Sequence, residues 1–193
     1  MAVQATESQL LAWALDYLRR FDVSKQRLRQ HLLQKAARAA ARLGHLDPAD
    51  RDDVFAEEAV SDDLRQRVDG VLADLERRRL LDDRRHAEVR LTALQARGLA
   101  PAVARARLRQ QGVDATVVAS AEASVQGEAG ETPREAALNA AWAAARRRRL
   151  GPYRPAADRG AERERDIAKL MRAGHAFEFA RAVIDSPVAE GAG

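Results

Sequence analysis

The sequence predicts an all-α protein, an elongated tandem array of three small three-helix repeats. β-branched residues are few, and no segment shows the period-two alternation of a half-buried strand. Aromatic residues make up only 4% of the 193 residues, which limits the size of any single core. The chain also matches itself when it is shifted by 76 residues, and then by 76 again.

The self-match needs no gaps and aligns cap residues, apolar positions and helix breaks together. Alanine-rich helices match by chance at apolar positions, so the agreement of all three kinds of position is what indicates a repeat. The aligned triplets are Thr6/Asp82/Asp158, Leu15/Leu91/Ile167, Leu18/Leu94/Leu170, Asp22/Gly98/Gly174, Arg29/Arg105/Arg181 and Leu32/Leu108/Ile184.

Each copy predicts a capped helix, a short break and a second helix. The side chains of Thr6, Asp82 and Asp158 are expected to accept hydrogen bonds from the unpaired N–H groups of the first helical turn. In the first copy a glutamine, Gln9, follows the cap at capping-box spacing. In the other two copies a glycine ends the capped helix, since glycine tolerates the left-handed conformation.

A leading helix is predicted ahead of the second and third copies, at about 62–79 and 134–149. For the helix at 62–79, Ser61 is the expected N-cap. One face of this helix is apolar and is formed by Leu64, Val68, Val71, Leu72 and Leu75. The first copy has too few residues ahead of Thr6 for such a helix. Its third helix is therefore absent or supplied from elsewhere, and segment 48–60 is one source.

These elements predict three domains. Residues 1–60 form the first repeat with an acidic insert, residues 61–126 form the second repeat, and residues 127–193 form the third repeat and a tail. The chain has no apolar leader and no apolar run of transmembrane length. We therefore expect a soluble, cytoplasmic protein, a monomer with no membrane partner.

The stretch from Leu80 to Arg90 raises the question of a metal or acid/base site, because Asp82, Asp83 and His86 lie within five residues. The repeat places Leu10 and Glu162 in the slot of the histidine, so no second imidazole is supplied. Capping by the first aspartate, with the second at the positive end of the helix dipole, is the simpler interpretation. We predict no catalytic residue, no metal and no cofactor, and no phosphate-binding loop or dinucleotide fingerprint occurs.

Charge is distributed unevenly along the chain, although the net charge is only +4. Eight acids accompany one arginine from Asp47 to Asp63, and seven arginines accompany one glutamate from Arg84 to Arg109. Arginine binds phosphate or carboxylate through a planar fork, although any such cluster can also be a solvated face. The predicted partner-binding residues are Arg97, Arg105 and Arg109, of which the last two share a helix face, with a second patch of Arg146, Arg147, Arg148 and Arg149.

The two tryptophans, Trp13 and Trp142, are interpreted as packing residues and not as platforms for stacked bases.

The run from Val71 to Asp114 resembles the central repeat of the RecX family, bacterial regulators of the RecA recombinase. The residues that carry the resemblance are Leu81, Asp82, Asp83, Ala87, Arg97, Gly98, Leu108, Gly112 and Val113. The first repeat fits through Ser24, Leu28 and Leu32, and the third more loosely through Leu170, Gly174 and Phe179. The resemblance covers most of residues 10–185 and rests on the order and spacing of the three repeats.

The resemblance implies a protein that binds in the groove of the RecA–DNA filament. It implies modulation of the recombinase, ATPase and coprotease activities of RecA, with inhibition as the expected direction, in recombination, DNA repair and the SOS response. The implied partners are the RecA filament and, without sequence preference, single- or double-stranded DNA. It does not imply an active site. Tandem repeats agree with this function, because they present extended binding surfaces.

The alternative is a helix-turn-helix transcriptional regulator, suggested by the short helices, the glycine-containing turns and the arginines. Such a protein needs a recognition helix with base-reading side chains and is usually a dimer. The three candidate helices here differ at their polar positions. Sequence-specific retardation of DNA would distinguish the repressor from a filament-binding protein.

Overall fold

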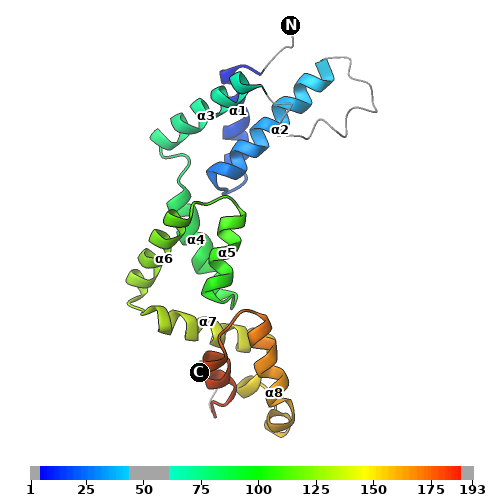
Figure 1. Cartoon of the computed structure of the whole chain (residues 1–193), viewed down its shortest axis with the longest axis vertical. Helices are drawn as coiled ribbons and strands as arrows, with labels where there is room; N and C mark the ends of the chain where they lie inside the picture. Colours follow the sequence, from blue (N-terminus) through cyan, green and yellow to red (C-terminus); the bar gives the residue numbers. More distant parts are fainter. Residues whose placement is uncertain (1–4, 44–60, 188–193) are drawn as a thin grey trace. The chain divides into compact units, whose positions relative to one another are not determined.

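The computed structural model describes residues 5–43 and 61–187, and all regular structure within them is helical, with no strand (Figure 1). The all-α prediction is therefore confirmed for these residues, whereas most of the acidic segment and the end of the tail lie outside them. The elements are α1 (Glu7–Leu18), α2 (Lys25–Leu43), α3 (Asp62–Arg77), α4 (Asp83–Ala96), α5 (Pro101–Gln110), α6 (Ala115–Ala129), α7 (Pro133–Arg148), the 3₁₀ turn η4 (Gly151–Tyr153), α8 (Ala156–Arg172) and α9 (Phe177–Ile184).

None of the helices in these ranges combines the length and the apolar character that crossing a membrane requires.

The described residues divide into two compact units. Unit 1 contains residues 5–43, 61–86 and 111–113, and unit 2 contains residues 87–110 and 114–187. The boundary falls inside α4, whose first turn belongs to unit 1.

The core of unit 1 is formed by α1, α2 and α3, each of which contacts the other two. The apolar face predicted for α3 is buried as expected, and Ser61 accepts a hydrogen bond from the Leu64 N–H at 3.3 Å. The repeat spacing groups this helix with the second copy, but its five buried residues pack with α1 and α2. Two helices leave much of their apolar surface open to water, and α3 supplies the third side that covers it.

The main core of unit 2 is formed by α7, α8, α9 and η4. Helix α7 packs almost entirely through alanines, including Ala141, Ala144 and Ala145. Such small side chains allow close approach of neighbouring backbones. Helix α5 contacts both α6 and α7.

The second helices of the three copies begin at equal spacing along the chain. Helices α2, α5 and α9 start at residues 25, 101 and 177, which are 76 residues apart. Leu32, Leu108 and Ile184, one of the aligned triplets, are all buried. For the first helix of each copy, burial at the aligned positions agrees less well. Leu15 is 38% exposed, whereas its counterparts Leu91 and Ile167 are buried.

Two of the three predicted caps are confirmed. Thr6 and Gln9 form a complete capping box at the start of α1, and the Asp82 carboxylate accepts from the Arg85 N–H at 3.0 Å. The prediction for Asp158 was wrong, because α8 begins two residues earlier and Pro155 is its N-cap. The helix begins at Ala156, directly after this proline, so Asp158 lies inside its first turn, where its charge is favourable at the positive end of the helix dipole.

Two glycines of the repeat end their helices with positive φ, as predicted. Gly98 has φ +76° and lies directly against α7, because a Cβ atom there would be 2.4 Å from the Ala144 nitrogen and 2.5 Å from its Cα. Gly174 has φ +95°, and its Cβ would meet the side chain of Val103 at 2.4 Å. These glycines are therefore needed both for the turn and for the contact between helices.

One carboxylate, Asp166 on α8, is almost completely buried in unit 2, with 1% of the residue exposed. It accepts two bonds from Arg154, at 2.6 and 2.9 Å, one from the Gly151 N–H at 3.0 Å and one from Lys169 at 3.0 Å. Burial by itself raises the pKa of Asp166, but these hydrogen bonds outweigh it and lower the pKa to about 2. This carboxylate therefore ties η4, and the arginine that follows it, to α8.

Candidate partner-binding surface

The Leu-Asp-Asp motif has a structural role in unit 1. Leu81 is buried at 4% exposure, and Asp82 caps α4. Asp83, the first residue of α4, accepts a hydrogen bond from the Lys25 N–H at 2.7 Å and so caps α2 as well. Burial raises the pKa of Asp83, although the bond from Lys25 acts in the opposite direction. The motif therefore joins the N-termini of two helices.

His86 also takes part in this junction. Its side chain is 4% exposed, and Nδ1 lies 2.9 Å from an oxygen of Asp22 in the loop between α1 and α2. Within residues 5–43 and 61–187, no group of three or more His, Cys, Asp or Glu side chains is placed to hold a metal ion. The geometry of Asp82, Asp83 and His86 is that of a helix junction.

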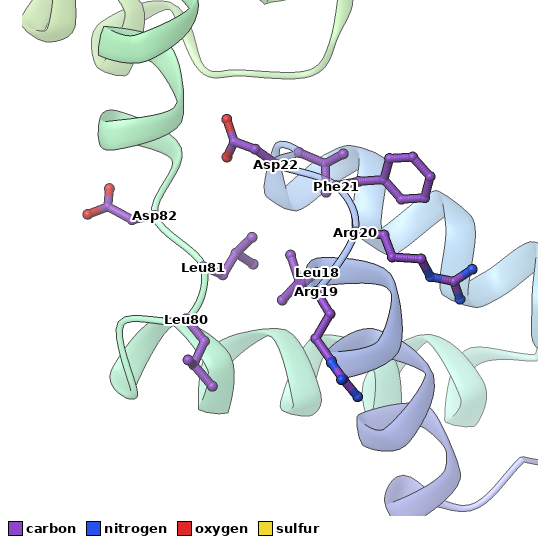
Figure 2. A pocket seen from close by; sticks show the side chains of 9 residues that line it. Leu18, Arg19, Arg20, Phe21, Asp22, Leu80, Leu81 and Asp82 are labelled. Carbon is purple, nitrogen blue, oxygen red and sulfur yellow. The ribbon is translucent and has the colours of Figure 1, made fainter.

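A pocket of about 280 Å³ lies beside this junction (Figure 2). Its lining residues are Leu18, Arg19, Arg20, Phe21, Asp22, Val23, Leu80, Leu81 and Asp82. Figure 2 shows Leu18 and Leu81 pointing toward each other, with the Asp82 carboxylate directed away from them. Because the lining carries two arginines and two aspartates, its charge favours neither an anion nor a cation.

Replacement of Asp82 by alanine should destabilise unit 1 by about 1 kcal/mol, because the Arg85 N–H loses its acceptor. Trp13 packs against the core of this unit, so urea denaturation can be followed by its fluorescence in a Trp142→Phe background. Asp82→Ser retains an acceptor and should stay within a few tenths of a kcal/mol of wild type. Equal losses in both variants would contradict the capping role.

The arginines predicted as the partner-binding surface all lie in unit 2. Arg97 is exposed at the end of α4, and its neighbour Gly98 packs against Ala144 of α7. Ala144 precedes Arg146 by only two residues. The structure therefore brings Arg97 into the neighbourhood of the run Arg146–Arg149, which the sequence treats as a separate patch.

Arg105 and Arg109 differ in their surroundings, although they share a helix face. Arg105 lies 2.7 Å from Glu122 of α6, whose side chain is only 14% exposed, and this ion pair joins α5 to α6. Arg109 is exposed in the last turn of α5, and its guanidinium has no ion pair or hydrogen bond with any described residue. Of the two, Arg109 has the charge that a partner can reach without breaking an existing pair.

The run Arg146–Arg149 is exposed throughout. Helix α7 ends within it, because Arg149 is the C-cap and has φ 54°. Cations in the last turn of a helix also stabilise it through the helix dipole. Arg148 donates to the Lys169 carbonyl at 3.4 Å, whereas Arg146, Arg147 and Arg149 have no side-chain partner among the described residues.

The charge of Arg148 also acts on His175, which is 5% exposed and lies 3.1 Å from the Gly98 carbonyl through Nε2. Burial is the main reason that the pKa of His175 is lowered, and the positive charge of Arg148 contributes. A neutral imidazole can donate from Nε2 to this carbonyl. His175 thus holds the turn that carries Arg97.

The two tryptophans have different surroundings. Trp142 packs against the core of unit 2 and meets Tyr153 edge-on, with ring centroids 6.2 Å apart. Trp13 packs against the core of unit 1, as predicted, but it also lines a groove on the surface. The sequence did not reveal this groove, because it is formed by the pairing of α1 with α2.

Several of these contacts could not be found from the sequence. Glu122 is separated from Arg105 by 17 residues, Asp83 from Lys25 by 58 and Asp22 from His86 by 64. The one available signal was the unmatched His86, whose counterparts in the repeat are apolar or acidic. A buried histidine needs a hydrogen-bond partner, and an acidic residue in a facing loop is a natural one.

Over 174 residues the chain is 34% identical to the regulatory protein RecX of Myxococcus xanthus (strain DK1622). The alignment covers 90% of this chain and 82% of that protein. No family model matches the sequence, and no solved structure matches the chain.

Proposed function

Because the chain belongs to the RecX family of regulatory proteins, we propose that it regulates RecA by binding in the groove of the RecA–DNA filament. Inhibition of the recombinase, ATPase and coprotease activities is the proposed effect, in recombination, DNA repair and the SOS response. The observation that carries the proposal is the extent of the similarity to the RecX protein of Myxococcus xanthus. The alignment covers 90% of this chain and is not confined to a single motif.

The proposal includes the repeat architecture, an elongated array of three tandem three-helix repeats in a monomeric, cytoplasmic protein. The equal spacing of α2, α5 and α9 supports it. The segments are 1–60, 61–126 and 127–193, with α3 of the second segment contributed to the core of the first. An array of this kind suits a filament, since each repeat can contact a different protomer along the groove.

The proposed contact surface consists of the basic residues of unit 2, Arg97, Arg105, Arg109, Arg146, Arg147, Arg148 and Arg149. Their targets are phosphates of the DNA or carboxylates of RecA. The exposure of six of them supports this assignment, and Arg105 contributes through the side-chain surface that its pair with Glu122 leaves exposed. Arginine suits both targets, because its fork binds either group through two hydrogen bonds.

Charge reversal tests this surface at positions that hold no ion pair. The variants Arg109→Glu and Arg146→Glu/Arg147→Glu should weaken filament binding, most strongly at low salt. If the target is phosphate, each lost contact should also reduce the slope of log K against log salt by about 0.7 to 0.9. Binding is measured over a salt series with filaments on DNA of unrelated sequences.

Arg85→Glu is the matched control for Arg109→Glu, because Arg85 is also exposed but lies in unit 1 outside the proposed surface. Arg105→Glu is avoided, since it would place a carboxylate beside Glu122 and disturb the α5–α6 contact. If affinity and slope are unchanged in the unit 2 variants, the contact surface lies elsewhere.

RecA-dependent ATP hydrolysis on single-stranded DNA tests the function itself. We expect addition of the protein to reduce the rate. The alternative, a helix-turn-helix repressor, predicts sequence-specific retardation of duplex DNA and no effect on hydrolysis.

A further inference from the structure

A groove of about 370 Å³ lies on unit 1 where α1 and α2 pack against each other. Its lining residues are Trp13, His31, Gln34, Lys35, Arg38 and Ala39. All but the tryptophan come from one stripe of α2, at helical spacings of three and four. The groove is thus a helix face with an indole beside it.

Two aromatic side chains of α1, together with Phe21 in the loop that follows it, form a ridge beside this stripe. Trp13, Tyr17 and Phe21 follow one another at intervals of four residues, and the last is 50% exposed. Tyr17 stacks on His31 with ring centroids 4.0 Å apart and an interplanar angle of 18°. Lys35 places its ammonium 4.9 Å from the Trp13 ring centroid. In both contacts, a nitrogen-bearing side chain of α2 therefore lies against an aromatic ring of α1.

Among the described residues, none that lines the groove carries a carboxylate. Lys35 and Arg38 supply positive charge, and their charges, after burial, lower the pKa of His31. Gln34 is exposed and has no partner among the described residues, so its amide is available both to donate and to accept. Cations, aromatic rings and an amide together match the phosphates, bases and base edges of a nucleic acid strand.

In contrast to the interpretation of Trp13 as a packing residue only, we propose that this groove binds single-stranded nucleic acid, with a base against the Trp13 ring and a phosphate held by Lys35. Single strands expose the faces of their bases, whereas a duplex keeps its bases stacked inside. An acidic peptide would use the cations but not the aromatic ridge. The site belongs to unit 1, whereas the proposed RecA-binding arginines belong to unit 2, and it does not depend on the proposed function.

The fluorescence of Trp13 tests the site directly. In a Trp142→Phe variant of the full chain, Trp13 is the remaining tryptophan. Titration with oligothymidylate of about 15 nucleotides should quench its emission, because a base stacks on the indole. Duplex DNA and polyglutamate at equal charge concentration should cause much less quenching. No RecA is present, so failure here leaves the proposed function untouched.

Two groove variants measure affinity in the otherwise unchanged chain, by the anisotropy of the labelled oligonucleotide. Gln34→Glu adds a negative charge to the groove without removing a packed side chain, and Lys35→Gln removes a phosphate ligand. Each should weaken binding about tenfold, and Lys35→Gln should lower the salt slope by about 0.7. Gln66→Glu, on the exposed face of α3, is the matched control with the same change in charge and should bind as wild type.

Three results would overturn the proposal. One is unchanged Trp13 emission in saturating oligonucleotide. Another is equal weakening by Gln34→Glu and Gln66→Glu, which would indicate a general effect of net charge. The third is a polyglutamate affinity equal to that of oligothymidylate, which would identify the groove as a site for acidic peptides.

Discussion

Replacing Gly98 with alanine should destabilise unit 2 by about 3 kcal/mol or more. Two penalties add at this position. The φ of +76° is unfavourable for a residue with a Cβ, at about 1–2 kcal/mol. The new methyl would also lie 2.4 Å from the Ala144 nitrogen, and a helix backbone cannot move aside as a flexible side chain can.

Gly130 provides the matched control, because it also has positive φ, +64°, but nothing lies within 4 Å of its Cβ position. Gly130→Ala should therefore cost only the backbone term, about 1 kcal/mol. Both variants are compared by urea denaturation in a Trp13→Phe background, where Trp142 reports on the core of unit 2. Equal losses would mean that Gly98 is required for its turn and not for its contact with α7.

Removal of the Asp166 carboxylate should have an effect of similar size. Asp166→Ala leaves Arg154 without its main partner, and it removes the acceptor of the buried Gly151 N–H. Breaking a buried ion pair from one side typically costs about 3–5 kcal/mol. We expect a loss of this order in unit 2, measured by urea denaturation with the same tryptophan probe.

Asp185 is the control for Asp166, because it also receives two bonds from one arginine, Arg163, each at 2.6 Å. Its side chain is 35% exposed, against 1% for Asp166. Water and salt screen an ion pair at the surface, so Asp185→Ala should cost about 1 kcal/mol or less. A loss as large as that of Asp166→Ala would show that burial is not what makes the difference.

The low pKa of Asp166 also predicts a pH dependence of stability. The carboxyl titrates near 3.8 in the unfolded chain and at about 2 in the folded protein, so the unfolded state binds more protons between these values. Stability from this group is therefore complete above about pH 5 and is lost as the pH falls toward 2, by about 2 kcal/mol. Asp166→Asn should remove this part of the acid sensitivity, measured by urea denaturation between about pH 5 and pH 2.5.

The arginines illustrate how far a charge pattern predicts a binding surface. The i, i+4 spacing of Arg105 and Arg109 correctly places both on one face of α5. It does not indicate that Glu122 pairs with the first of them, because that contact depends on how α6 packs against α5. Charge patterns identify where cations gather, whereas packing decides which of them a partner can reach.

The sequence alone determined the features that depend on a few neighbouring residues. The helical class follows from apolar periodicity, the start of α1 from the Thr6–Gln9 capping box, and the helix end at Gly98 from the freedom of glycine at positive φ. Asp158 was misplaced because Pro155 is a competing local start signal, three residues earlier.

Only the tertiary structure decided which helices share a core and which charged groups meet. The packing of α3 with α1 and α2, the capping of α2 by Asp83, the network around Asp166 and the groove beside Trp13 all join segments through their positions in space. An amphipathic helix specifies that one face must be buried but not which partner buries it. Apolar burial is non-directional, so the choice is made by the shapes of all the helices together.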